Sequence, residues 1–441
     1  MSFDRRRFLS TSSAALAIPF VHTAYAAQRV SIASWDHFVP GATDTVAKLC
    51  REWASREQVE LHIDFITSQG NKHLLTIAAE QQAHSGHDVL FFPVWSAAAA
   101  ADDLVVVDDV MAQLIEQNGA VSRVAEYLGR QNGHWVGVPS PVGSQISSPC
   151  ARIDLFKKYV GIDLTEMYPP GAPAKKSLAA QWTWDLFLTA AEKCFKAGYP
   201  FGMPLGQTAD SVNWVGAVFA SYGAQLVDEH GNVTTNSDAV KQVLEWFRRL
   251  VLYLPPGVIS WDDQSNNKWL ISGKGALIMN PPSAWAVAVR DAPQVAGQLW
   301  TFPSPAGPKG RFAPANPNNW GIWKFSKNIS AAKSLLMYLS RRSSVEQIVA
   351  ASHGYDIPAF EKLHDFKIWD EEGPPRGTLS HYPPRDDQIV SIACAPAPPK
   401  IAQQMYTQAV MPKMIARMAQ GDSTDTVIEW VTNELEGLMR V

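Results

Sequence analysis

Residues 29–95 alternate between two hydrophobic periodicities, and this alternation limits the possible folds more than any other feature of the sequence. The segment at 43–57 places Val46, Leu49, Cys50 and Trp53 at i, i+3, i+4 and i+7, the pattern of an amphipathic helix, and the segment at 72–84 is also helical in pattern. The segments between them either alternate apolar and polar residues or form a continuous apolar run, as strands do. In chain order these are a strand at 29–34, a helix at 43–57, a strand at 59–66, a helix at 72–84 and a strand at 88–95. This order predicts a doubly wound α/β lobe, in which ligands bind beyond the carboxyl ends of the strands.

The remaining sequence is long enough for a second lobe. A chain of 441 residues exceeds the size of one typical hydrophobic core, and its 46% hydrophobic and 18% charged content is that of a globular protein. The strand before residue 139 runs into Pro139 and Pro141, which cannot extend a sheet ladder, and new helical patterns follow. We therefore expect the chain to cross between two lobes near residues 139–143.

The N-terminus has the three-part layout of an export signal. Basic residues precede a modest apolar segment, and small residues at 24–26 provide a cleavage site. Arg5 and Arg6, followed by Phe8 and Leu9, resemble a twin-arginine signal, although Asp4 replaces the usual Ser or Thr. No cysteine follows the apolar segment, so a lipid anchor is not expected. The sequence predicts cleavage near Ala26 and release into the periplasm.

Charge and cysteine content restrict the partners and the covalent structure. The whole chain has a formal net charge of −4, and removal of residues 1–26, which carry three Arg and one Asp, leaves −4 − 2 = −6. An acidic surface offers no phosphate-binding face, so a nucleic-acid partner is not expected. The four cysteines contain no C-x-x-C pair, and disulfides and buried free thiols both fit an oxidising compartment: Cys50, Cys150, Cys194 and Cys394.

Five segments, taken in order, resemble the extracellular solute-binding proteins (family 1) of carbohydrate ABC importers, the group that includes maltose-binding protein. Each segment is similar to a helix start, hairpin, strand or crossing of that family, and together they extend over nearly the whole mature chain. They are 152–164, 181–194, 221–251, 271–285 and 318–340.

The resemblance implies a fold and a domain organisation. The fold is the type II periplasmic binding protein, in which two doubly wound α/β lobes are joined by a multi-segment hinge and close on the ligand. Carried onto this sequence, the crossings lie near 139–143, 274–276 and 318–321. The expected division is a signal peptide at 1–26, an N-terminal lobe of 27–139 plus 277–318, and a C-terminal lobe of 140–276 plus 319–441.

The implied ligand is a sugar, an oligosaccharide or a glycoside. Aromatic rings stack on the C–H face of a sugar, and carboxylates or amides bind its hydroxyl edge. Trp35, Asp36 and Trp95 follow predicted strands, whereas Trp285, Tyr355 and Asp356 match the stacking and cleft-loop positions of the family. Further candidates are aromatic and amide side chains beside one another or at a strand end: Trp214, Asn280, Asn319 and Trp320.

These features predict a monomeric transport protein rather than an enzyme. Its expected partners are the ligand, the permease subunits of an ABC importer and, during export, the twin-arginine translocase. Binding of a polyol, sugar acid or polyamine is the alternative, and a twin-arginine-exported oxidoreductase is a more distant one. No catalytic motif, cofactor fingerprint or metal site is expected, since His84 and His87 lack neighbouring Cys or His ligands in the sequence.

Overall fold

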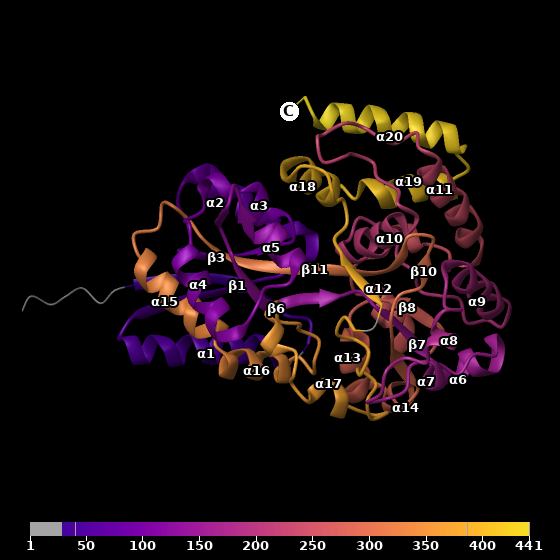
Figure 1. The fold of residues 1–441 in the computed structure, drawn as a ribbon, viewed down its shortest axis with the longest axis horizontal. Coiled ribbons are helices and arrows are strands. Elements are labelled where there is room, and N and C mark those ends of the chain that lie inside the picture. Colours follow the sequence, from indigo (N-terminus) through magenta and orange to yellow (C-terminus); the bar gives the residue numbers. More distant parts are fainter. Residues whose placement is uncertain (1–28, 40, 386, 441) are drawn as a thin grey trace, which may run out of the picture.

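The computed structural model describes residues 29–39, 41–385 and 387–440, which form two α/β lobes around two separate sheets (Figure 1). The predicted export signal, with Arg5, Arg6, Phe8 and Leu9, lies outside the described residues. Among the residues that are described, no helix combines the length and apolar character needed to span a bilayer.

The larger sheet belongs to the first lobe and to the connection between the lobes. Its strand order is β10-β11-β3-β1-β2, with β6 and β12 also paired to β11. β1 runs parallel to β2 and β3, whereas β11 runs antiparallel to β3 and β6. The doubly wound start predicted for residues 29–95 is therefore confirmed. The strands are β1 (Arg29–Trp35), β2 (Glu60–Ile66), β3 (Val89–Pro93), β6 (Val138–Ile146), β10 (Ala306–Gly307), β11 (Gly310–Ile322) and β12 (Gln388–Ser391).

Helices and one short hairpin cover this sheet. α1 buries the apolar stripe predicted from its sequence, including Val46, Leu49 and Trp53. The elements of this lobe are α1 (Ala42–Glu57), α2 (Lys72–Ala83), α3 (Ser96–Ala99), α4 (Asp108–Asn118), α5 (Arg123–Gly129), β4 (Arg130–Gln131) and β5 (His134–Trp135).

The second lobe is built on a small antiparallel sheet of β7 (Pro149–Arg152), β8 (Leu277–Met279) and β9 (Leu299–Thr301), in the order β8-β7-β9. Its helices lie around that sheet, on the right of Figure 1. They are α6 (Ile153–Leu155), α7 (Leu164–Met167), α8 (Lys176–Ala179), α9 (Trp184–Lys196), α10 (Ala209–Tyr222), α11 (Asp238–Leu250), α12 (Ser265–Ile271), α13 (Ser283–Asp291) and α14 (Pro293–Ala296).

β8 differs from the sequence-based expectation, which placed 277–318 in the first lobe. It pairs with β7 of the small sheet, and Gly202 N donates to Leu277 O at 2.8 Å. Residues 274–276 therefore connect two elements of the second lobe, α12 and β8, and do not cross between the lobes. Three consecutive buried apolar residues fit either sheet, and nothing in the local pattern specifies which strand they pair with.

β6 and β11 carry the chain between the lobes. They pair antiparallel, with a register shift between Asn316 and Asn318, and extend from one lobe toward the other in Figure 1. The predicted crossings at 139–143 and 318–321 lie within these two strands. The expectation that the strand stops at Pro139 and Pro141 is wrong, because β6 runs through both prolines and Pro139 pairs with Asn319 of β11.

The helices after β11 also differ from the expectation that 319–441 belongs to the second lobe. α15 (Ile329–Ser340) packs on α1 and α4, and α16 (Arg342–Ala351) packs on α1 and β6. The indole of Trp53 donates to Ser334 Oγ at 3.1 Å across the α1–α15 contact. The physical reason is that β11 ends beside β3, so the helices that follow it cover the first sheet.

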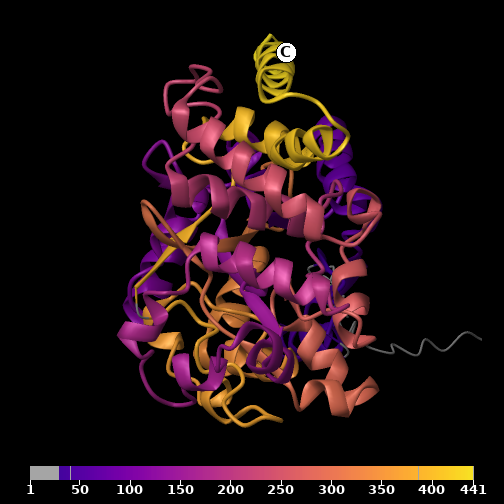
Figure 2. The same cartoon turned by 90° about the vertical axis from the view of Figure 1, so that its right-hand side faces the viewer.

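The chain returns to the second lobe only after a long connection that contains α17 (Ile368–Glu371). The C-terminal helices then stack beside α10 and α11, and α18 also contacts α3 of the first lobe. They lie at the top of Figure 2, in yellow. They are α18 (Pro399–Thr407), α19 (Val410–Ala419) and α20 (Thr424–Leu438).

Candidate functional site

A cavity of about 550 Å³ lies between the lobes, a volume typical of small-molecule sites. The first lobe contributes the carboxyl ends of β1 and β3, the segment at 68–71 and the start of α2. The second contributes the start of α10 and the loop at 259–263, and residues of β6 and β11 form part of the wall. The cavity thus lies beyond the strand ends, where the doubly wound pattern predicts a ligand.

Trp35, the last residue of β1, forms part of the first-lobe wall. Its ring lies 4.6 Å from that of His37, 6.4 Å from Phe91 and 6.3 Å from Tyr355, measured between centroids. Gly143 of β6 has a φ of +69°, and a Cβ there would lie 2.7 Å from the Trp35 ring. Only glycine therefore allows β6 to pass so close to this indole.

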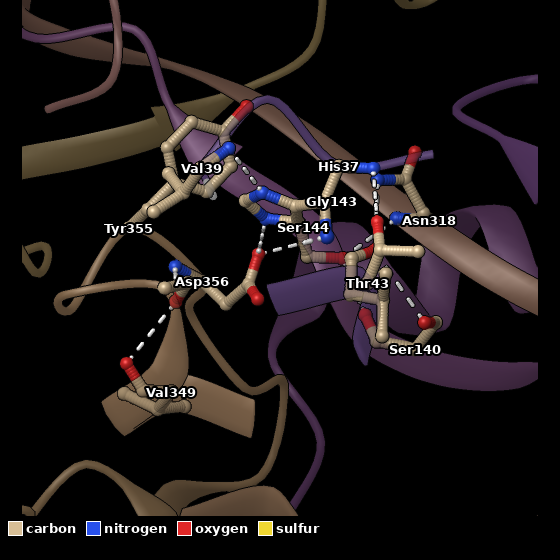
Figure 3. A network of polar contacts seen from close by, with 12 residues as sticks. His37, Val39, Thr43, Ser140, Gly143, Ser144, Asn318, Val349, Tyr355 and Asp356 are labelled. Carbon is tan, nitrogen blue, oxygen red and sulfur yellow. Dashed lines mark hydrogen bonds and ion pairs between the residues drawn. The ribbon is translucent and has the colours of Figure 1, made fainter. Parts of the chain in front are cut away.

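A buried polar network of His37 and Asp356 lies beside Tyr355 (Figure 3). The His37 ring contacts both aromatic residues of the wall, since its centroid lies 4.6 Å from that of Trp35 and 4.8 Å from that of Tyr355. His37 Nδ1 accepts the N–H of Val39 at 2.9 Å, so Nε2 carries the proton and donates to Asp356 Oδ1 at 3.0 Å. The same Oδ1 accepts the N–H of Gly143 at 2.8 Å. The network joins the first strand, the β6 crossing and the loop after α16.

The second-lobe wall presents two neighbouring carboxylates, Asp210 and Asp263, at the start of α10. Asp210 is 5% exposed, and its Oδ2 accepts the amide of Asn266 at 3.0 Å. Burial and then the Asp263 charge raise the pKa of Asp210 well above its usual value. Burial also raises the pKa of Asp263 to about 6, although N–H groups at the helix start partly offset this.

Three buried amides form a second polar group beside these acids. Asn280 Nδ2 donates to Asn267 Oδ1 at 2.5 Å and to Asn266 Oδ1 at 3.3 Å, while Asn267 Nδ2 donates to Ser283 Oγ at 3.0 Å. Because Asn280 and Asn267 line the cavity, their fixed amides are able to bind hydroxyl groups of a ligand.

Of the ten predicted ligand residues, three line the cavity: Trp35, Asn280 and Tyr355. Three tryptophans instead lie in the core, where each indole N–H donates to a backbone carbonyl. Trp95 donates to Ala393, Trp214 to Pro204 and Trp285 to Pro374. Trp285 lies inside α13 and is fully buried, so its indole packs in the core and does not face the cavity.

The other four predicted residues also lie outside the cavity wall. Asn319 and Trp320 are buried in β11, and the side chain of Asn319 packs against Gly129 and Gly137. Asp36 is exposed and accepts the Thr43 hydroxyl at 3.2 Å. Asp356 is buried behind Tyr355 and acts through the network described above.

The sequence-based candidates omitted Asp210, Asp263, Trp261 and Tyr406, which all line the cavity. Tyr406 OH lies 3.1 Å from Asn213 Oδ1 and 3.3 Å from Asn316 Oδ1. One sequence signal was available for Asp210: it follows Thr208, whose hydroxyl caps α10 by accepting the N–H of Ser211. Polar residues at the start of a helix that follows an extended segment are candidates for ligand contact.

One group of side chains in the described part of the chain has the composition of a metal site. The ligand atoms of His62, Asp64 and His87 all lie within 4.8 Å of one another. They pair with one another in the absence of an ion, and His87 Nδ1 also bonds Glu80 Oε1 at 2.5 Å. None of them lines the cavity.

Comparison with known proteins identifies the family. The model of the bacterial extracellular solute-binding protein family matches residues 91–344. A probable ABC transporter-binding protein of Deinococcus radiodurans strain R1 is 27% identical over 288 residues, which are 61% of this chain and 66% of that protein. The match thus spans just under two thirds of the length of this relative.

Solved structures share the fold at low sequence identity. T. maritima MalE3 with bound maltose superposes with a TM-score of 0.74 at 20% identity, covering 93% of this chain and 100% of that one. A sugar transporter protein of Arthrobacter chlorophenolicus A6 with bound laminaribiose gives 0.72 at 16% identity, covering 93% and 99%. These likenesses show the two-lobe fold, and the family model extends over more than half of the sequence. The chain belongs to the bacterial extracellular solute-binding proteins.

Proposed function

We propose that this protein is the substrate-binding component of an ABC importer and binds a sugar, oligosaccharide or glycoside between its lobes. The observation that carries the proposal is the composition of the cavity wall. Trp35, Trp261 and Tyr406 offer aromatic faces, and Asn267 and Asn280 offer fixed amides beside them. Rings and amides together match the two sides of a sugar, its C–H face and its hydroxyl edge. The relatives with maltose and laminaribiose agree with this ligand class.

Binding is proposed to close the lobes about β6 and β11. A ligand that contacts Trp35 on one wall and Asn280 on the other stabilises the closed arrangement, because only that arrangement allows both contacts. The closed form then delivers the ligand to the permease subunits. The protein works as a monomer, after export through the twin-arginine translocase and cleavage near Ala26.

Thermal melting of the mature protein with a library of mono- and oligosaccharides tests the ligand class. A sugar that binds only the folded state raises the melting temperature in proportion to the logarithm of its concentration. The proposal fails if neither a melting shift nor co-purified sugar is found across the library. A visible chromophore or stoichiometric metal in the purified protein would instead favour the oxidoreductase alternative.

Export has a separate test. Replacement of Arg5 and Arg6 by Lys keeps the charge and is expected to abolish periplasmic accumulation. Unchanged periplasmic yield would refute the twin-arginine assignment and leave the ligand proposal intact.

A further inference from the structure

The acidic side chains that line the cavity have no Lys or Arg beside them in the described lining, although the charge of Lys268, outside it, acts on Asp262. Its described lining residues include the carboxylates of Asp210, Asp262 and Asp263 and no Lys or Arg. Burial lowers the pKa of His73, the histidine of the wall, and its Nε2 bonds the carbonyl of Phe91. Burial likewise raises the pKa of Tyr355, which keeps its phenol neutral. The wall therefore holds negative charge that no cation within it balances.

Helix capping accounts for Asp262 and Asp263 but not for Asp210. Thr208 already caps α10 through its hydroxyl, and Asp262 accepts the N–H of Gln264 and the hydroxyl of Ser265 near the start of α12. The positive end of the α10 dipole favours one nearby anion, namely Asp263. A second carboxylate at the same helix end, Asp210, is buried with a neutral amide as its bonding partner.

One oxygen of the carboxylate pair has no hydrogen-bond partner among the described residues. Asp263 Oδ1 is buried without a hydrogen-bond partner. Two neighbouring carboxylates taken out of water without a counter-charge destabilise the ligand-free protein, unless one of them is protonated. Such a destabilisation of the ligand-free protein is typical of a binding site whose ligand supplies the missing counter-charge.

Aromatic rings surround the same space. Trp261 and Tyr406 line the cavity together with the acids. The pKa of Tyr406 is raised mainly by burial and also by the nearby charge of Asp263. Asp210 and Asp263 also add to the raised pKa of Tyr355, so both phenols are near the pair. Acids beside ring faces, without a competing cation, are the surroundings that bind an ammonium group.

We infer that the ligand is an amino sugar or an amine-bearing glycoside whose protonated amine is held between Asp210 and Asp263. This inference rests on the proposed function and makes its ligand class narrower. The ammonium group supplies the positive charge that the pair lacks and a donor for the unpartnered Asp263 oxygen, and the sugar ring contacts the aromatic wall. A sugar acid is disfavoured, since its carboxylate would enter a cavity that is already negative.

Isothermal titration of the mature protein with three matched disaccharides tests the inference. The probes are the glucosamine disaccharide with free amines, its N-acetylated form and cellobiose. The free-amine form is expected to bind more tightly than the two neutral forms, on the order of tenfold or more. Asp210→Asn and Asp263→Asn keep the side-chain size and are expected to remove that preference. Asp291→Asn, which loses one exposed charge beside Arg290, is the matched control and should keep it.

The outcomes separate the inference from the proposed function. Equal affinity for the amine and neutral forms, or a preference that survives both substitutions, overturns the inference and leaves a sugar-binding protein. If spermidine binds and none of the three disaccharides does, the inference is also overturned, and the ligand is a polyamine. If no carbohydrate of a broader library binds either, the proposed function itself fails. Melting curves of both variants without ligand verify that they are folded.

Discussion

His37 and Asp356 are 319 positions apart in the sequence, and their side chains meet at 3.0 Å in the interior of the protein. His37 follows β1 and Asp356 follows α16, and the same carboxylate oxygen also receives the N–H of Gly143 in β6 (Figure 3). One buried carboxylate thus joins three segments that determine the positions of Trp35 and Tyr355. The wall of the cavity depends on a residue that does not itself line it.

Asp356→Ala is therefore expected to weaken both stability and binding. The substitution leaves His37 Nε2–H and Gly143 N–H buried without an acceptor, which is expected to lower the free energy of unfolding by about 3 kcal/mol. Urea denaturation of the ligand-free protein measures this change, and titration with a ligand measures the loss of affinity.

Asp370→Ala is the control for that experiment. Asp370 pairs with Arg385 at 3.0 Å, but both side chains are partly open to solvent, and solvent-accessible pairs contribute little to stability. Equal urea midpoints for the Asp356 and Asp370 variants would contradict the structural role assigned to Asp356.

Trp261 and Trp285 should respond differently to the same substitution. Trp261 lines the cavity, so Trp261→Ala is expected to weaken ligand binding by about 1–3 kcal/mol with a smaller effect on stability. Trp285 is fully buried, so Trp285→Ala is expected to lower the free energy of unfolding by about 3–5 kcal/mol and leave the affinity of the folded protein unchanged. Titration and denaturation of both variants measure the two effects, and the reverse assignment would place Trp285 at the ligand.

The contrast between these tryptophans shows which features were predictable from the sequence. Local periodicity predicted the strands and helices of residues 29–95, and the rule that ligands bind at strand ends then placed Trp35 at the cavity. The same rule selected Trp95, but its indole turns into the core and bonds Ala393. A strand end specifies where a residue lies and does not specify which way its side chain points.

Features that depend on long-range packing were not predictable. β8 is a short apolar strand, and its partner β7 is specified by the packing of the second lobe. Asp210 and Asp263 are ordinary polar residues in the sequence, and only the docking of the 259–263 loop on the start of α10 makes them neighbours. The acidic character of the cavity is therefore a property of the tertiary fold.

The cysteines, whose pairing the sequence left open, are expected to be unreactive in the native protein. All four are buried free thiols in the structure. Burial raises the pKa of Cys50, Cys150 and Cys194 to about 12 and also raises that of Cys394. At pH 8 the thiolate fraction of the first three is about a thousandfold below that of a free cysteine. Ellman's reagent should detect no thiol in the native protein and four in denaturant, and a lower count in denaturant would indicate a disulfide.

The stability of the ligand-free protein should depend on pH through Asp263. Its pKa is 3.8 as a free side chain and about 6 in the folded protein, because burial disfavours the charged form. The carboxyl group therefore adds no penalty below pH 3.8, and it destabilises the fold progressively as the pH rises through 6. Asp263→Asn removes the titratable group. The variant is expected to fold, because Asn still accepts hydrogen bonds at a helix start. The variant is expected to match the parent near pH 4 and to be more stable by about 3 kcal/mol at pH 7.5. Urea denaturation at the two pH values measures the difference. If the parent protein is as stable as the variant at pH 7.5, or more stable, the fold itself neutralises this carboxylate and the prediction is wrong.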